Sequence, residues 1–165
     1  MKKGLIKRKV CICKNNLKYN IDFGNLPLIN NYKKKKNLDK YPTIITQCSK
    51  CLLIQLKYSV TDKLLFPNNY SYLSGNSKEK INNFQSLVSK IKKISSQNNI
   101  QILDIGSNDG SFLELAKKSK IKVLGIEPTN TAKISIKKNV NTIKKHLNLT
   151  LAKKILKKYS KFDFI

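Results

Sequence analysis

The sequence predicts an α/β protein in which a small cysteine-rich module precedes a parallel sheet. Three observations favour this fold class. All four cysteines lie within the first 60 of the 165 residues. From residue 100 onward, short apolar runs alternate with helical stretches, which is typical of parallel strands joined by right-handed crossovers. A turn with glycine at both ends, Gly106-Ser107-Asn108-Asp109-Gly110, follows the first of these runs. We therefore expect two domains, residues 1–75 and 76–165.

Short strands and turns are expected in the cysteine-rich module. The motif Cys48-Ser49-Lys50-Cys51 separates two strand-like runs, residues 43–47 and 52–57. Glycine and proline in Gly24-Asn25-Leu26-Pro27 and in Tyr41-Pro42 predict turns. Residues 61–78 are rich in Asn, Ser and Tyr, and we expect a loop or lid there.

In the second part, residues 79–95 predict an amphipathic helix, because apolar residues recur at spacings of three and four. We then expect strands over residues 100–105, 121–126 and 140–143, alternating with helices over 111–119, 129–139 and 149–159. A further strand begins at Phe162, and the sequence ends at Ile165. Parallel sheets rarely stop within a strand, so we expect an incomplete sheet. The apolar positions of the first helix are Ile81, Phe84, Leu87, Val88, Ile91 and Ile94.

The net charge of +25 raises the question of nucleic-acid binding, because lysines that neutralise phosphates release counterions. Only Arg8 is arginine, however, and base readout favours arginine. The charge is also spread evenly, with +12 over residues 1–60 and +13 over residues 61–165. Lysine therefore fills ordinary solvated positions, and we expect the run Lys33-Lys34-Lys35-Lys36 to be an exposed loop. Neither a membrane span nor a signal peptide is predicted, so we expect no membrane partner and a soluble, cytoplasmic protein.

The cysteines have the spacing of a metal site. A short C-x-x-C turn presents two sulfurs to one ion, and tetrahedral Zn²⁺ takes four thiolates, so we expect a structural zinc. Disulfides compete with this interpretation, although a chain without a secretion signal belongs in a reducing compartment, and buried unliganded cysteines are a second alternative. Only one residue separates Cys11 from Cys13. Either that turn is strained or one ligand comes from elsewhere. The expected ligands are Cys11, Cys13, Cys48 and Cys51.

The glycine turn lies where open α/β sheets bind ligands, beyond the carboxyl end of a strand. Its G-x-x-x-G spacing lacks the G-x-G-x-x-G of dinucleotide sites. Three of only nine acidic residues, Asp104, Asp109 and Glu127, fall at the tips of the first two strands, where they would repel a pyrophosphate. S-adenosylmethionine carries a sulfonium and an ammonium group, which nearby anions favour. Alternatively, the glycines serve turn geometry alone and Glu127 is a solvated cap. The expected cofactor-binding residues are Asp104, Gly106, Ser107, Asn108, Asp109, Gly110 and Glu127.

Together these residues resemble the amino-terminal part of the sugar C-methyltransferases that act on nucleotide-activated deoxysugars. That family joins a zinc-binding domain to a Rossmann-like S-adenosylmethionine-dependent methyltransferase domain and a further domain. The resemblance covers nearly the whole chain. Its matching stretches are residues 23–32, Tyr41-Pro42, residues 48–56, residues 70–75, residues 103–110 and Gly125-Ile126-Glu127-Pro128.

The resemblance implies a methyltransferase acting on a nucleotide-linked keto-sugar, with Cys13, Cys48 and Cys51 as zinc ligands. The fourth family cysteine would fall on Val10, so Cys11 is displaced by one residue. Tyr70 and Tyr72 match a segment over the substrate pocket. The family's catalytic-base segment follows the strand that begins at Phe162, and the only histidine, His146, is expected at the surface.

We therefore expect this chain to be inactive alone, as the product either of a truncated gene or of a split gene whose missing half lies on a separate chain. The alternative is a basic zinc-ribbon protein that binds nucleic acid.

Overall fold

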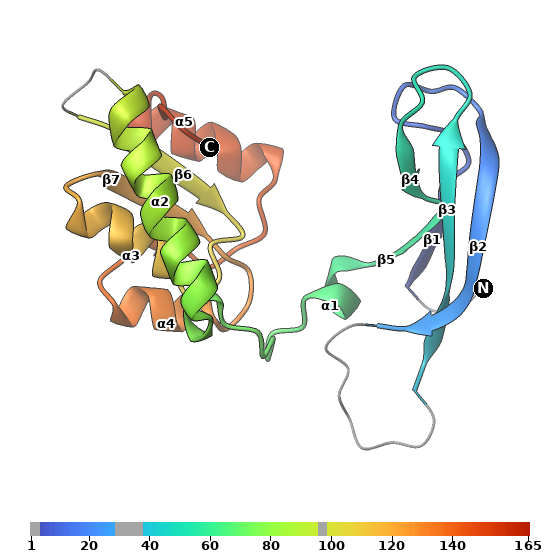
Figure 1. Ribbon diagram of the computed structural model, residues 1–165, viewed down its shortest axis with the longest axis horizontal. Helices are drawn as coiled ribbons and strands as arrows, with labels where there is room; N and C mark the ends of the chain where they lie inside the picture. Colours follow the sequence, from blue (N-terminus) through green and yellow to red (C-terminus); the bar gives the residue numbers. More distant parts are fainter. Residues whose placement is uncertain (1–3, 29–37, 96–98) are drawn as a thin grey trace. The chain divides into compact units, whose positions relative to one another are not determined.

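The computed structural model describes residues 4–28, 38–95 and 99–165, and these form two compact units, Met1–Pro67 and Asn68–Ile165 (Figure 1). Each unit is described by itself. The expected lysine loop at residues 33–36 lies outside the described residues, as does the end of the family-like stretch 23–32.

The first unit consists of two small antiparallel sheets. In one, β1 (Leu5–Lys7) pairs with β5 (Tyr58–Val60). The other has the strand order β2-β3-β4. A four-residue helix, α1 (Asp62–Leu65), follows β5, within the segment that the sequence predicted as a loop or lid. The strands of the larger sheet are β2 (Leu17–Pro27), β3 (Lys40–Cys48) and β4 (Ile54–Leu56).

Both turns predicted from glycine and proline in this unit are wrong, because these residues lie inside strands. Gly24 sits in a β-bulge of β2, between the register positions of Asp22 and Asn25. Its φ of +76° is one that glycine adopts without strain, and its N–H donates to Oδ1 of Asp22 at 2.8 Å. Pro42 pairs with Asn25, in a part of β3 that β4 does not reach. A missing donor is tolerated there because that side of β3 has no ladder.

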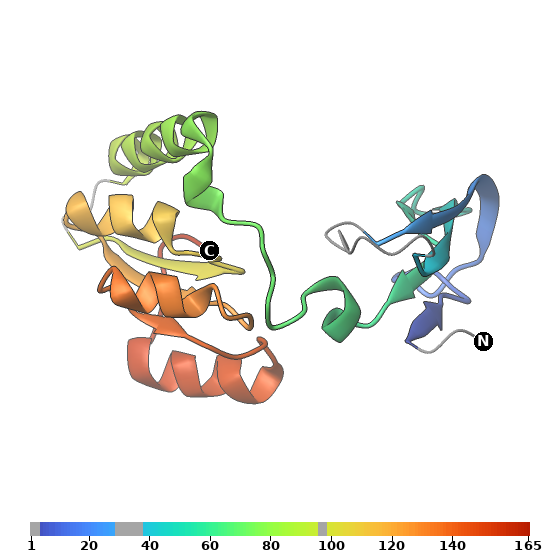
Figure 2. The same cartoon turned by 90° about the horizontal axis from the view of Figure 1, so that it is seen from below.

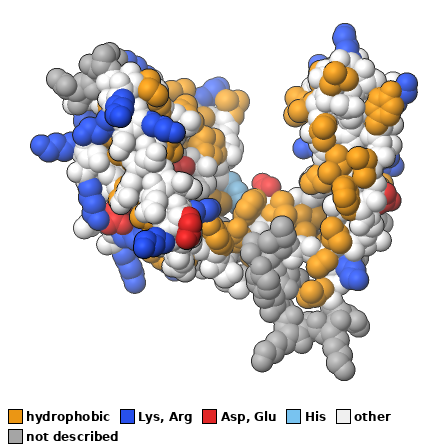
Figure 3. Space-filling view, in the orientation of Figure 1, with side chains coloured by type: hydrophobic (Ala, Val, Ile, Leu, Met, Phe, Trp, Pro, Cys, Tyr) orange, Lys and Arg blue, Asp and Glu red, His pale blue; other side chains and the backbone are white. Residues whose placement is uncertain are grey.

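The apolar core of the first unit is small. Among the described residues of this unit, the buried hydrophobic side chains are Cys11, Tyr41, Cys48 and Val60, and two of these four are cysteines. Alternate residues on one face of the larger sheet are instead exposed, and hydrophobic side chains are visible over this unit in Figure 3. A module with so little buried apolar area depends on a cross-link or a metal for stability. The exposed apolar residues on β2 and β4 are Tyr19, Ile21, Phe23, Leu26, Ile54 and Leu56.

The second unit has a parallel sheet with the strand order β6-β7-β8. The backbone of Phe164 forms a further parallel bridge to Ile102, with the N–H of Leu103 donating to its carbonyl at 3.0 Å. This bridge lies where the sequence predicted the start of a fourth strand. The three strands are β6 (Gln101–Ile105), β7 (Lys122–Ile126) and β8 (Thr142–Ile143).

Helices cover both faces of this sheet (Figure 2). Alternation along β6 explains the two layers. Ile102 packs with Val88, Ile91 and Leu113 of α2 and α3 on one face, and Leu103 packs with Ile155 of α5 on the other. The helices are α2 (Lys78–Ile94), α3 (Ser111–Lys118), α4 (Ala132–Lys137) and α5 (Leu149–Tyr159), close to the predicted ranges. The predicted α/β fold, with a cysteine module and a partial Rossmann-like parallel sheet, is confirmed.

The boundary between the units falls after Pro67, whereas the sequence placed a boundary after Gly75. Residues 68–75, including the start of the 3-10 turn η1 (Ser74–Asn76), belong with the second unit. The backbone N–H groups of Ser74 and Gly75 donate to side chains of the glycine loop, and this attaches the segment to the sheet.

Lysine side chains are distributed over the visible face of the second unit in Figure 3 without forming one basic patch. In the part of the chain that the structure describes, no helix combines the length and apolar character needed to cross a bilayer.

Candidate functional site

The four cysteines come together in the first unit. Their sulfur atoms all lie within 4.8 Å of one another, with 3.6 Å between Cys11 and Cys51 and 3.5 Å between Cys13 and Cys48. These distances exceed the roughly 2.05 Å of a disulfide, and all four cysteines are free. Four sulfurs about 2.3 Å from one tetrahedral zinc ion would be about 3.8 Å apart, so this cluster has the donor set and dimensions of a structural zinc site.

Two hairpin turns bring the cysteines together, and the first of them explains how Cys11 and Cys13 can both reach the cluster with only one residue between them. The first is closed by the N–H of Cys11 donating to the carbonyl of Asn15 at 2.9 Å, and the second by Cys48 donating to Leu53 at 3.0 Å. The first turn is therefore one residue shorter. Each contains a residue with φ near +60°, Lys14 in the first and Leu52 in the second. Cys11 itself joins the cluster, and no ligand from elsewhere is required.

Hydrogen bonds shift the pKa values of three of the thiols in different directions. The side chain of Asn15 donates to Cys13 at 3.4 Å and lowers the pKa of Cys13 to about 6. Backbone N–H groups of Cys51 and Lys50 lower the pKa of Cys48. The backbone of Leu53 lowers the pKa of Cys51, but the neighbouring Cys13 and Cys48 outweigh it and raise that pKa to about 12. Thiolates therefore form at Cys13 and Cys48 before Cys51, and metal binding must displace the proton of Cys51.

In the second unit, the glycine loop connects β6 to α3 at the carboxyl end of the sheet. The N–H groups of Gly106 and Ser107 both donate to the carbonyl of Ile126, at 2.8 and 3.1 Å, and hold the loop against the end of β7. Gly106 has φ +85°, and a Cβ built on it meets no atom within 4 Å. Gly110 has φ +73°, but a Cβ there would lie 2.8 Å from Cβ and 3.2 Å from Cα of Ser135. Gly106 thus borders open space, whereas Gly110 permits close packing.

Glu127 directly follows β7 and is buried. Its Oε2 accepts from the N–H of Asn108 at 3.0 Å, and its Oε1 accepts from the N–H of Thr129 at 2.8 Å. The carboxylate therefore connects the glycine loop to the segment after β7. Each oxygen has a second lone pair, so the group can still accept hydrogen bonds from a ligand.

Asp104, near the end of β6, lines a cavity of about 560 Å³ together with Ser74, Gly106 and Ser107. Burial and then the charge of nearby Glu127 raise the pKa of Asp104 to about 6. The hydroxyl of Ser107 is buried and has no hydrogen-bond partner among the described residues. An ionised carboxylate held in partial burial is a site for a cation, and an orphaned hydroxyl beside it is consistent with a polar ligand.

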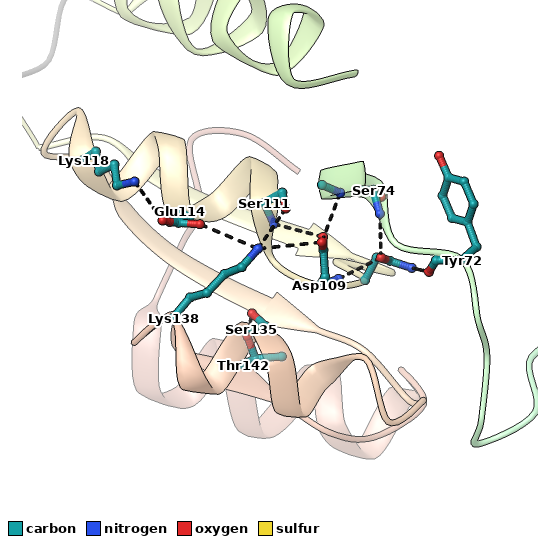
Figure 4. Close-up of polar contacts among 11 residues, drawn as sticks. Tyr72, Ser74, Asp109, Ser111, Glu114, Lys118, Ser135, Lys138 and Thr142 are labelled. Atoms are coloured by element: carbon teal, nitrogen blue, oxygen red, sulfur yellow. Dashed lines mark hydrogen bonds and ion pairs between the residues drawn. The ribbon is translucent and has the colours of Figure 1, made fainter. Parts of the chain in front are cut away.

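Asn108 and Asp109, both predicted to bind the cofactor, have side chains that form hydrogen bonds with residues 72–75; Figure 4 shows those of Asp109. Oδ1 of Asn108 accepts from the N–H of Ser74 at 3.0 Å, and its Nδ2 donates to the carbonyl of Tyr72 at 3.0 Å. Oδ2 of Asp109 accepts from the N–H of Gly75 at 3.0 Å and lies 3.6 Å from Nζ of Lys138. These two side chains fasten a distant segment to the loop.

Three further residues had predicted positions. The ring of Tyr72 is partly exposed, with Nζ of Lys80 4.7 Å from its centroid, and Tyr70 is half-buried. Figure 4 shows the Tyr72 ring directed away from the polar network. His146 is exposed in the segment before α5, as expected.

Residues 11–66 match a family model described as "Putative zinc binding domain". The chain is also 26% identical, over 129 residues, to the C-methyltransferase NovU of Streptomyces niveus. That alignment includes 74% of this chain and 30% of NovU, so the chain spans less than a third of that relative's length. The predicted resemblance to the amino-terminal part of a C-methyltransferase is confirmed.

Sequence reasoning missed the roles of Ser74, Gly75 and Lys138. Lys138 donates to the hydroxyl of Ser111 at 2.9 Å, besides its ion pair with Asp109. Gly75 is needed for close approach, because a Cβ there would lie 2.5 Å from Oγ of Ser111. Only the glycine gave a sequence signal, and it did not indicate a partner 34 residues away.

Proposed function

We propose that the second unit binds S-adenosylmethionine and that the chain is the amino-terminal portion of a C-methyltransferase. The observation that carries this proposal is the pairing of Asp104 with Glu127 at the carboxyl ends of two adjacent parallel strands, beside Gly106. The chain has only nine acidic residues against 34 basic ones, yet two of them lie close enough that the charge of Glu127 raises the pKa of Asp104. A cationic ligand is favoured by that arrangement, and a pyrophosphate is disfavoured.

The residues present fit such a donor. Gly106 would allow its backbone to approach the ligand, since its missing side chain faces open space. Asp104 would face the cationic part, and Glu127 would accept hydrogen bonds from the ribose hydroxyls. When bound, S-adenosylmethionine supplies an electrophilic methyl group.

For the first unit, we propose a structural zinc ion held by Cys11, Cys13, Cys48 and Cys51. Four thiolates complete the tetrahedral coordination of zinc and leave no open position for a reactant. The metal would therefore stabilise a module with a small core.

The proposed acceptor is a nucleotide-linked keto-deoxysugar, as the resemblance implies. Methylation beside a sugar ketone requires a base that abstracts a proton, and we assign no residue to that role. Tyr70 and Tyr72 are proposed to lie on the substrate side. A separate chain is the proposed source of the catalytic base.

Calorimetric titration with S-adenosylmethionine, beside a salt series with RNA and DNA, tests this proposal against the zinc-ribbon alternative. We expect saturable binding of the donor, weaker in Glu127→Gln and unchanged in Glu79→Gln, a matched exposed glutamate. Steep salt-dependent nucleic-acid binding, together with no response to the donor at millimolar concentration, would overturn it.

A further inference from the structure

Residues 72–75, here called the strap, are attached to the glycine loop by three hydrogen bonds from two consecutive side chains. Asn108 holds the strap twice, through the carbonyl of Tyr72 and the N–H of Ser74. Asp109 holds it once, through the N–H of Gly75. The strap and the loop are 34 to 36 residues apart in sequence. Their attachment is therefore a tertiary feature that unites the start of the second unit with the proposed donor site.

The two holding side chains are themselves fixed. Asn108 has φ 51°, a left-handed conformation that asparagine tolerates better than most residues, and its Oδ1 also accepts from the N–H of Asp109 at 2.9 Å. Asp109 is buried and receives the N–H of Ser111 at 3.3 Å. Nζ of Lys138, at the end of α4, lies 3.6 Å from Oδ2 of Asp109 and 3.6 Å from Oε2 of Glu114 (Figure 4). The two side chains that hold the strap are therefore part of the packed second unit.

The strap also forms part of the cavity. Ser74 lines it together with Asp104, Gly106 and Ser107. A change in the position of the strap therefore changes one wall of the proposed donor site. It also moves the Tyr72 backbone, which Asn108 holds directly.

We propose that Asn108 and Asp109 are positioning residues, which bind the strap rather than the ligand and couple its order to occupancy of the glycine loop. The coupling rests on the proposed function, since the ligand of the loop is taken to be S-adenosylmethionine. Coupling between two sites is reciprocal. A ligand that fixes the loop therefore stabilises the strap, and a substitution that loosens the strap lowers the affinity for the ligand.

Two substitutions detach the strap in different ways. Asn108→Gly keeps the positive φ available while removing both hydrogen bonds between this side chain and the strap. Gly75→Ala introduces a Cβ 2.5 Å from Oγ of Ser111 and 2.7 Å from Oδ2 of Asp109, so it forces the strap outward. Asn108→Asp retains the acceptor for Ser74 but cannot donate to Tyr72. Asn141→Ala is the matched control, because it removes an asparagine hydrogen bond to Tyr159 elsewhere in the unit.

Hydrogen exchange at the amides of Ser74 and Gly75, measured on the full chain, reports the strap directly. We expect both amides to exchange about tenfold faster in Asn108→Gly and Gly75→Ala, the effect of losing about one hydrogen bond. Adding S-adenosylmethionine should slow exchange in the wild type. In Asn108→Asp, we expect protection of Ser74 to be retained. Titration should show about tenfold weaker donor binding in the two detaching variants and wild-type binding in Asn141→Ala.

Wild-type exchange and wild-type donor affinity in both folded detaching variants would overturn the inference while leaving the proposed function intact. If Gly75→Ala does not fold, Asn108→Gly decides between these results. Failure of the folded wild type to bind the donor would instead overturn the proposed function and the coupling. The exchange rates without ligand would then decide the attachment of the strap alone.

Discussion

Glu127 accepts a hydrogen bond from the backbone N–H of Asn108, with 3.0 Å between Oε2 and nitrogen. This contact ties the end of β7 to the centre of the glycine loop. The other carboxylate oxygen of Glu127, Oε1, accepts a hydrogen bond from the backbone N–H of Thr129. One buried carboxylate therefore shapes the loop and, under the proposed function, also receives the ligand. Removing it entirely would affect both roles.

Two substitutions of Glu127 should affect its structural role to different extents, while both weaken donor binding. Glu127→Ala leaves the buried N–H of Thr129 and the partly buried N–H of Asn108 without an acceptor and should lower the free energy of unfolding by about 1–3 kcal/mol. Glu127→Gln keeps one acceptor oxygen and the shape, so we expect a smaller loss of stability but still weaker donor binding. Thermal denaturation and calorimetry measure the two effects. Equal donor affinity in wild type and Glu127→Gln would contradict the ligand role.

The two glycines of the loop should respond differently to alanine. In Gly106→Ala, only the positive φ is strained, which costs about 1 kcal/mol. The new methyl group would project into the open space beside the loop, so donor binding should fall much more than stability. Gly110→Ala would also push its Cβ against the backbone of Ser135 and should destabilise the second unit strongly. The contrast is measured as melting temperature against donor affinity. Equal destabilisation by both would refute it.

The raised pKa of Asp104 should make the stability of the folded chain depend on pH. Burial and the charge of Glu127 raise its pKa from 3.8 to about 6, so ionisation is harder in the folded chain. Its contribution to stability is fully present below pH 3.8 and is lost as the pH rises through about 6. Asp104→Asn should therefore be more stable than the wild type at pH 7.5, by at most about 3 kcal/mol, with the difference vanishing near pH 4.

The same substitution should weaken donor binding, because it removes the anion that faces the cation. In the wild type, donor binding should release a proton near pH 6, and affinity should decline as the pH falls below that value. Titration in two buffers of different ionisation enthalpy detects the proton. A more stable Asp104→Asn that binds the donor normally would disprove the role of the carboxylate.

Removal of zinc should unfold the first unit selectively. Its buried core is small, whereas α2, α3, α4 and α5 all belong to the second unit. A chelator should abolish exchange protection in β2–β4 while most of the helical circular dichroism persists. Cys11→Ser should reduce metal affinity, with Ser49→Ala as a control in the other turn. Because the proton of Cys51 must be displaced, affinity should also fall with decreasing pH. Full metal affinity in Cys11→Ser would contradict its assignment as fourth ligand.

Periodicity alone located most of the second unit. The helix over residues 79–95 and the strands at 100–105 and 121–126 correspond to α2, β6 and β7, because each buries an apolar stripe or run against one sheet. Periodicity did not predict the short elements within residues 61–78. It is polar, and its short elements α1 and η1 bury no side chain that would leave a pattern.

The sequence by itself determined the order of the two units, the metal-binding chemistry of the first and the glycine–acid pattern of the second, because these depend on residue type and short spacing. Only the tertiary structure decided that Cys11 completes the cluster, that Gly24 bends a strand, and that Asn108 and Asp109 hold the strap. Those outcomes depend on hydrogen bonds and packing between distant segments. No local pattern of residues records which partner folding brings into reach.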